Sequence, residues 1–300
     1  MKTMRRMIGT AAGAALLAVS LIALARGADG RMAIGGSLTV AEHAAGNPTA
    51  AVDARDGTGY VAWIATEEGV SNVFLARVGT DGGRAAPVRV NDRPGDAAPH
   101  EQAPAQVAAG PDGAVYVLWQ NNTKVPGRRF PASDLRFARS ADGGRTFGPA
   151  VTVNDDAGGV PSSHTFHDVA VAPDGTVWIS WIDSRARDAA RAARPVSGGP
   201  APAGHGHGHA EEADLPPSEI RVAKSTDGGR TFGASVVVDT APCPCCRTSL
   251  ALAADGTVYL AWRKEYAGDV RDVVVARLDA GAAAFSAPAR VHADAWVFPA

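Results

Sequence analysis

The chain has 300 residues, with 29 Lys and Arg against 31 Asp and Glu and a formal net charge of −2. This length allows one large all-β domain or two smaller ones, each with a full hydrophobic core. The balanced charge excludes the broad basic surface that nucleic acid or an anionic membrane would attract, so neither is an expected partner.

The N-terminus has the pattern of an export signal. Lys2, Arg5 and Arg6 precede an apolar run over residues 8–25, which ends in the small-x-small tripeptide Ala-Leu-Ala. This pattern predicts a signal peptide cleaved near Ala25, an extracytoplasmic bacterial protein (periplasmic or secreted), and no stable membrane insertion after cleavage. The alternative is an uncleaved anchor, because the run is nearly long enough to cross a bilayer.

Two internal repeats follow. The first is an Asp-Gly turn that leads into a β-rich run ending in Trp, and it occurs four times, at residues 56–63, 112–119, 174–181 and 255–262. Each copy marks a hairpin between a first and a second strand. The four tryptophans occupy equivalent places at the ends of second strands, which favours a role in the core: Trp63, Trp119, Trp181 and Trp262.

The second repeat is Ser-x-Asp-Gly-Gly-x-Thr-Phe, at residues 140–147 and 225–232. The Asp carboxylate can accept hydrogen bonds from nearby backbone N–H groups, and the two glycines permit positive φ. Thr-Phe then restarts an extended strand. Such a unit joins a third strand to a fourth, and four strands per repeat is the sequence form of a propeller blade.

The fold class expected is therefore all-β, a β-propeller of four-stranded antiparallel blades. A segment rich in Ala, Gly and Pro, with alternating His and Gly, is expected to form a flexible insertion between the second and third strands of the third blade. The expected organisation is a signal peptide at 1–25, an N-terminal segment at 26–46, a propeller at 47–300 with blades at about 47–98, 99–160, 161–240 and 241–291, and the insertion at 185–217.

The Ser-x-Asp-Gly-Gly-x-Thr-Phe motif resembles the Asp-box, or BNR repeat, of the sialidase-like β-propellers of the neuraminidase superfamily. Propellers of that family typically have six blades or more, so the resemblance implies about six blades in a complete protein, of which four are visible here. The alternative is a propeller that closes with four blades. It also implies exo-α-sialidase or another glycoside hydrolase activity on extracellular glycans as one candidate function. In such blades the Asp turns lie on the structural face, away from any central site.

The loops between blades and between second and third strands lie on the opposite face, and all eight histidines and all three cysteines fall in these segments or at their rim. Histidine and thiolate are the usual ligands of zinc and copper. We therefore expect a Cu or Zn site at the mouth of the propeller channel, formed by His100, His164, His167, Cys243, Cys245 and Cys246. The alternative is a Cys243–Cys246 disulfide, with histidines present only because loops are polar.

The sialidase resemblance implies a second set of residues. The family's enzymes hold the substrate carboxylate with three arginines and use a tyrosine nucleophile, a glutamate and an aspartate acid/base. The family's Arg-Ile-Pro motif is missing from this chain. The candidates on the loop face are Arg247 and Arg263, with Arg185, for the carboxylate, Asp183 or Asp168 as acid, and Glu265 beside Tyr266 as nucleophile pair; for each, the alternative is an ordinary surface ion pair.

The preferred interpretation is an exported propeller that binds a ligand or metal rather than a standard sialidase. Recognition of a glycan or small molecule without catalysis is a further possibility.

Overall fold

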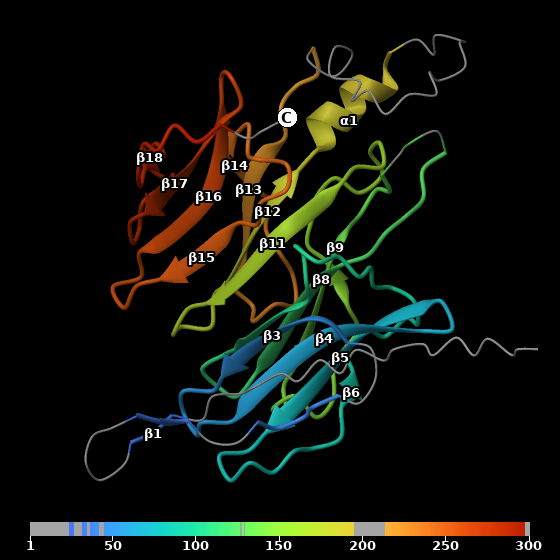
Figure 1. The fold of residues 1–300 in the computed structure, drawn as a ribbon, viewed down its shortest axis with the longest axis vertical. Coiled ribbons are helices and arrows are strands. Elements are labelled where there is room, and N and C mark those ends of the chain that lie inside the picture. The colour runs from blue at the N-terminus through green and yellow to red at the C-terminus, as the bar shows by residue number, and fades with distance from the viewer. Residues whose placement is uncertain are drawn as a thin grey trace, which may run out of the picture.

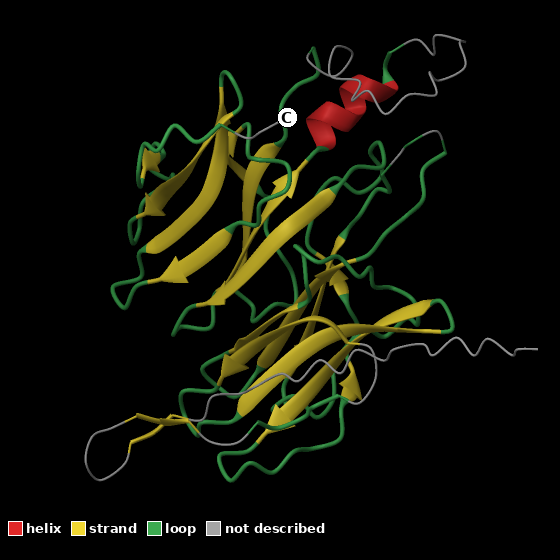
Figure 2. Cartoon of the chain, viewed as in Figure 1, coloured by secondary structure: helices red, strands yellow, loops and turns green. Residues whose placement is uncertain are grey.

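The computed structural model describes residues 24–26, 32–34, 37–41, 45–126, 128, 130–194 and 214–297. Within them the chain forms four antiparallel four-stranded sheets and one short helix (Figures 1 and 2). In each sheet the strands pair in sequence order. The first sheet contains β3 (Ala45–Val52), β4 (Gly59–Glu67), β5 (Val70–Val78) and β6 (Val88–Arg89), and the second contains β7 (Gln106–Ala109), β8 (Val115–Gln120), β9 (Leu135–Ser140) and β10 (Val151–Thr152). The third sheet contains β11 (His164–Val171), β12 (Val177–Asp183), β13 (Glu219–Ser225) and β14 (Val236–Thr240). The fourth sheet contains β15 (Ser249–Leu252), β16 (Val258–Tyr266), β17 (Val270–Leu278) and β18 (Ala289–Arg290).

The first strands of consecutive sheets adjoin one another. Strand β3 contacts β7, β7 contacts β11, and β11 contacts β15. The first strands therefore lie in a row, and each sheet extends from its first strand to its fourth. Figure 1 shows this order for β15 to β18. This is the arrangement of propeller blades, and it confirms the expected fold class.

Apolar side chains fill the spaces between neighbouring sheets. One buried cluster lies between the first and second sheets, one between the second and third, and one between the third and fourth. Trp119, Trp181 and Trp262 are fully buried in these three clusters. Their role in the core is confirmed, and they offer no exposed aromatic surface to a ligand.

The Asp142 and Asp227 turns fold alike. Asp142 Oδ1 accepts hydrogen bonds from the backbone N–H groups of Arg145 and Thr146, both at 2.9 Å, and Oδ2 accepts one from Thr146 Oγ1 at 2.6 Å. Asp227 makes the same three bonds in the third sheet, at 2.9, 3.0 and 2.6 Å. Each carboxylate thus satisfies the donors of its own turn.

One part of the expected insertion is ordered. Residues Arg185–Ala192 form helix α1, so the expectation of an irregular loop is wrong for this stretch. Buried Asp188 holds the helix in place: it pairs with Arg128 at 3.1 Å and Arg191 at 2.6 Å, and it accepts a bond from the Ser163 N–H at 3.2 Å. Arg128 belongs to the preceding blade and Ser163 to the second-to-third blade loop, so local composition does not reveal these two contacts.

The expected leader up to residue 23 lies outside the described residues, as do the histidines at 43, 205, 207 and 209. Strands β1 (Leu24–Arg26) and β2 (Met32–Ile34) form a separate two-stranded sheet. Among the described residues, no helix has both the length and the apolar character needed to cross a membrane.

Candidate functional site

The three cysteines form one cluster in the loop between β14 and β15. Cys243 N–H donates to the carbonyl of Arg263 at 2.8 Å, which fastens the start of the loop to β16. Cys246 N–H donates to the Cys243 carbonyl at 3.3 Å, so the chain turns back on itself. The Sγ atom of Cys243 then lies 3.4 Å from that of Cys245 and 3.1 Å from that of Cys246, and the remaining pair is 3.9 Å apart.

Two arginines lie against this cysteine cluster. Arg271 Nη1 lies 3.5 Å from Cys243 Sγ, and Arg263 Nη1 lies 3.8 Å from Cys246 Sγ. A hydrogen bond from the Cys246 thiol lowers the pKa of Cys243 to about 5, against the opposing effect of burial. The same hydrogen bond raises the pKa of Cys246, which donates it. The cluster therefore favours the thiolate form of Cys243, which lies next to the Arg271 guanidinium.

Two hollows adjoin the cluster. The larger, about 520 Å³, is lined by Arg263, Arg271 and Trp296 among others. The smaller, about 360 Å³, is lined by Cys246 and Arg247 and shares Arg263 with the larger. Cys243 is only 1% exposed, whereas Cys245 and Cys246 are partly accessible. A small ion or ligand therefore reaches the cluster from the side of Cys246.

Within the described part of the chain, these three cysteines are the only set of three or more His, Cys, Asp or Glu side chains whose ligand atoms lie close enough to share an ion. The expected ligand set of histidines and cysteines is corrected accordingly. His100, His164 and His167 do not join the cluster.

Each of these histidines has a local structural contact instead. His167 is fully buried, its Nε2 lies 3.1 Å from the Pro104 carbonyl, and burial lowers its pKa to about 3. His100 Nδ1 accepts a bond from the Gln102 N–H at 3.2 Å. His164 Nδ1 lies 2.6 Å from the Ser133 carbonyl. These contacts are structural, as in the alternative interpretation, although His164 and His167 lie in β11 rather than in a loop.

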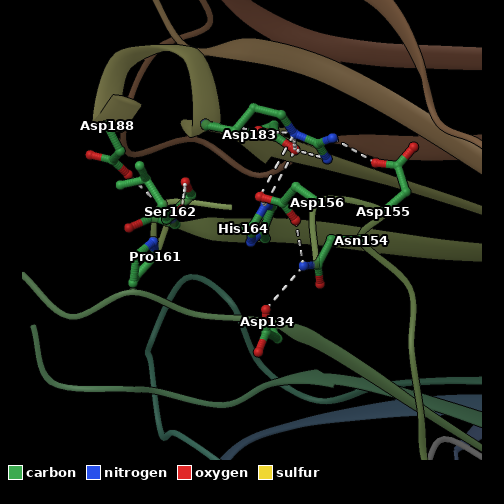
Figure 3. Close-up of polar contacts among 12 residues, drawn as sticks. Asp134, Asn154, Asp155, Asp156, Pro161, Ser162, His164, Asp183 and Asp188 are labelled. Atoms are coloured by element: carbon green, nitrogen blue, oxygen red, sulfur yellow. Dashed lines mark hydrogen bonds and ion pairs between the residues drawn. The ribbon is translucent and has the colours of Figure 1, made fainter. Parts of the chain in front are cut away.

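Figure 3 shows that His164 belongs to a network of carboxylates. Its Nε2 lies 3.1 Å from Asp156 and 3.5 Å from Asp183. Burial opposes a charge on His164, but these two carboxylates outweigh it and raise the pKa of the imidazole. Arg185 completes the network with ion pairs to Asp183 at 2.8 Å and Asp155 at 2.6 Å.

Asp183 is saturated by this network. Its carboxylate accepts bonds from the Trp181 indole N–H at 2.8 Å, from the Arg185 backbone N–H at 2.9 Å, and from the Arg185 guanidinium. Asp183 and Arg185 therefore bind each other and their neighbours, and neither side chain is positioned to contact a substrate. Asp168, the other candidate acid, accepts a bond from the Leu250 N–H at 2.7 Å, and burial raises its pKa.

The remaining glycosidase candidates lie at the end of β16. Glu265 pairs with Arg271 across the β16–β17 hairpin, and Arg263 pairs with Val273, so these side chains share one face of the sheet. Tyr266 follows Glu265 directly and therefore points to the other face, where the Arg290 guanidinium lies 3.9 Å from its ring centre. The structure thus separates the expected nucleophile pair.

Sequence reasoning did not identify Arg271. The feature that could have identified Arg271 is the hairpin register between β16 and β17, which places it opposite Glu265 and on the same face of the sheet as Arg263. That register depends on the turn at residues 267–269, which the sequence alone does not specify to one residue.

Comparisons with known proteins agree with the fold. A protein of unknown function from Dyadobacter fermentans is similar with a TM-score of 0.55 and 15% identity, over 86% of this chain and 68% of that one. A mutant of NanB sialidase from Streptococcus pneumoniae is similar with a TM-score of 0.51 and 7% identity, over 84% of this chain and 50% of that one. A further NanB structure, with Optactamide, has a TM-score of 0.50 and 7% identity.

The chain spans about half the length of the NanB chains it matches. No protein-family model and no curated protein matches it. At these identities the likeness concerns the fold alone: the chain has a β-propeller fold similar to that of these proteins.

Proposed function

We propose that this chain is an extracytoplasmic, sialidase-like propeller that binds one thiophilic metal ion, copper or zinc, through Cys243, Cys245 and Cys246. The observation that supports this proposal most directly is the group of three sulfur atoms 3.1–3.9 Å apart. Thiolates are the ligands that Cu(I) and zinc prefer.

The spacing of the three sulfur atoms allows them to bind one shared ion. Three sulfurs bound about 2.3 Å from one zinc stand about 3.8–4.0 Å from one another. The Cys245–Cys246 pair has that separation already. The other two pairs open by less than about 1 Å, which a small rotation of each side chain provides.

Metal analysis tests the proposal. Untagged protein is kept reduced, incubated with Zn²⁺ or Cu(I), freed of excess ion and assayed by elemental mass spectrometry. We expect close to one ion per wild-type chain and none in the Cys243→Ser/Cys245→Ser/Cys246→Ser variant. His100→Ala is the matched control and should retain the ion. A reduced, folded wild type that holds neither metal would overturn the proposal.

Oxidation provides a second test. Cys243 and Cys246 are close enough to form a disulfide, whose S–S bond is about 2.05 Å long. Oxidised glutathione accepts two electrons from the Cys243 and Cys246 thiols: the Cys243–Cys246 bond forms, the glutathione S–S bond breaks, and two reduced glutathione molecules leave with the two thiol protons. Because this step removes two of the three ligands, we expect at least a tenfold loss of metal affinity, measured by competition with a chromophoric chelator. Unchanged affinity in protein shown by mass spectrometry to have that disulfide would contradict the ligand assignment.

Hydrolysis of a sialoside is the second candidate function. One observation favours it: Arg263 and Arg271 line the larger hollow together, beside Trp296, and two guanidinium groups can hold a carboxylate. A fluorogenic sialoside tests this candidate. Turnover that Arg263→Ala abolishes would support it, whereas no turnover by the folded protein would exclude this substrate class.

A further inference from the structure

We propose that the cysteine cluster selects a monovalent, three-coordinate ion, Cu(I), over Zn²⁺, and that Arg263 and Arg271 set this preference. This inference rests on the proposed function and deepens it by naming the ion and the two residues that discriminate. Three features of the structure support it: the number of ligands, the charge around them and the accessibility of the sulfurs.

The cluster provides three ligands of one kind. Among the residues described, no histidine, aspartate or glutamate joins the three sulfurs as a fourth ligand. Glu265 belongs to the same face as Arg271 but is not part of the set. Structural zinc sites are almost always four-coordinate, so zinc here would need a water as its fourth ligand. A soft monovalent copper ion is satisfied by thiolates alone.

The surrounding charge matches a monovalent ion. Three thiolates with Cu(I) have a net charge of two units negative, and with Zn²⁺ of one unit negative. Two guanidinium groups, from Arg263 and Arg271, lie within 3.8 and 3.5 Å of the sulfurs. They neutralise the copper complex fully and leave the zinc complex one unit positive. Because the metal-free state is the same in both cases, the arginines shift the ratio of the two affinities toward copper.

Both arginines are held in position by the polypeptide around them. The Arg271 backbone N–H donates to the Trp296 carbonyl at 2.8 Å. The Arg263 guanidinium lies over the Trp296 ring, 5.1 Å from its centre. The Arg271 backbone and the Arg263 guanidinium are therefore in place before an ion arrives, which lowers the cost of ordering them on binding.

The burial of the sulfurs suits an ion that enters from one side. Cys243 is 1% exposed and lies against Arg271, whereas Cys246 lines the smaller hollow. An ion can be passed from an external thiol or chelator to Cys246 first and then to the buried Cys243. The low local dielectric around Cys243 strengthens the effect of the arginine charge.

The test measures two affinities in each variant. Full-length reduced protein under anaerobic conditions competes with bicinchoninate for Cu(I), and separately with a chromophoric chelator for Zn²⁺. We expect tighter binding of Cu(I), and X-ray absorption of the copper complex should show three sulfur ligands with no nitrogen or oxygen. Arg271→Ala should lower the ratio of copper to zinc affinity by roughly tenfold or more, because one nearby positive charge is lost.

Arg277→Ala is the matched control: it removes an exposed arginine from the same strand, β17, where Arg277 pairs with Asp279. This control should leave both affinities unchanged. Arg271→Lys keeps the charge and should retain most of the preference. Circular dichroism verifies that each variant is folded.

Failure of this inference is distinguishable from failure of the proposed function. If the wild type binds zinc more tightly than copper, or if Arg271→Ala and Arg263→Ala both leave the affinity ratio unchanged, the copper assignment is wrong while a thiophilic metal site stands. If the reduced wild type binds neither ion, both are wrong. A copper complex with a nitrogen or oxygen ligand would refute the three-sulfur geometry.

Discussion

Asp142 and Asp56 differ in how many turn donors each carboxylate satisfies. Asp142 accepts two backbone bonds and two hydroxyl bonds, from Thr146 Oγ1 and Ser140 Oγ, whereas Asp56 accepts one, from the Thr58 N–H at 2.8 Å. Asp142→Ala should therefore lower the free energy of unfolding by about 1–3 kcal/mol, because several donors lose their acceptor together. Asp56→Ala should cost less, and urea denaturation compares the two. Equal losses would show that the extra bonds contribute nothing.

Between elements, the Asp142 and Asp227 turns also pack their sheets against the preceding sheet. Gly229 has a φ of +81°, and a Cβ added there would lie 2.4 Å from Cε1 of Phe137 in the second sheet. Gly82 has a φ of +79°, and a Cβ there would meet nothing within 4 Å. The two positions therefore share the same backbone requirement but differ in packing.

Alanine at each glycine separates these contributions. Both substitutions incur the left-handed backbone cost of about 1–2 kcal/mol. Gly229→Ala should lose about 1–3 kcal/mol more, because the methyl group displaces the Phe137 ring. Chemical denaturation of both variants measures the difference. If Gly82→Ala lowers the free energy of unfolding as much as Gly229→Ala does, packing of the Gly229 turn against Phe137 does not stabilise the contact between the sheets.

At the scale of the whole molecule, the His164 network joins two blades. Asp156 belongs to the loop between the second and third sheets, while His164 and Asp183 lie at the ends of β11 and β12. Arg185 extends the network through Asp155, which accepts bonds from Ser235 just before β14. When the His164 imidazole is protonated, its charge therefore helps to hold these loops together.

This network predicts a pH dependence of stability. The folded-state pKa of His164 is raised above its ordinary value of 6.5, so its contribution is fully present below pH 6.5 and is lost as pH rises through the raised value. Thermal unfolding should show a wild-type melting temperature that falls over this window relative to His164→Gln. His292→Gln, at an exposed site, should follow the wild type. Parallel profiles for all three proteins would refute the linkage.

Much of the architecture was accessible from local patterns. The Asp-Gly turns and the alternating apolar runs specify hairpins over a few residues each, and the four repeats predicted the four sheets correctly. The buried tryptophans followed from their equivalent places in the repeats. Helix α1 was missed because Asp188 binds Arg128 and Ser163, which are distant in sequence.

Local sequence specifies the strands, the turns and the closeness of the three cysteines, since these depend on residues only a few positions apart. Which other side chains meet the cysteines depends on packing between segments that are distant in sequence. The sequence places the histidines and the cysteines in comparable segments between blades, yet His164 and His167 lie in β11, and the three rings face Ser133, Pro104 and Gln102 instead. Arg263 and Arg271 reach the sulfurs because hairpin register and loop path, both set by packing between sheets, bring them together.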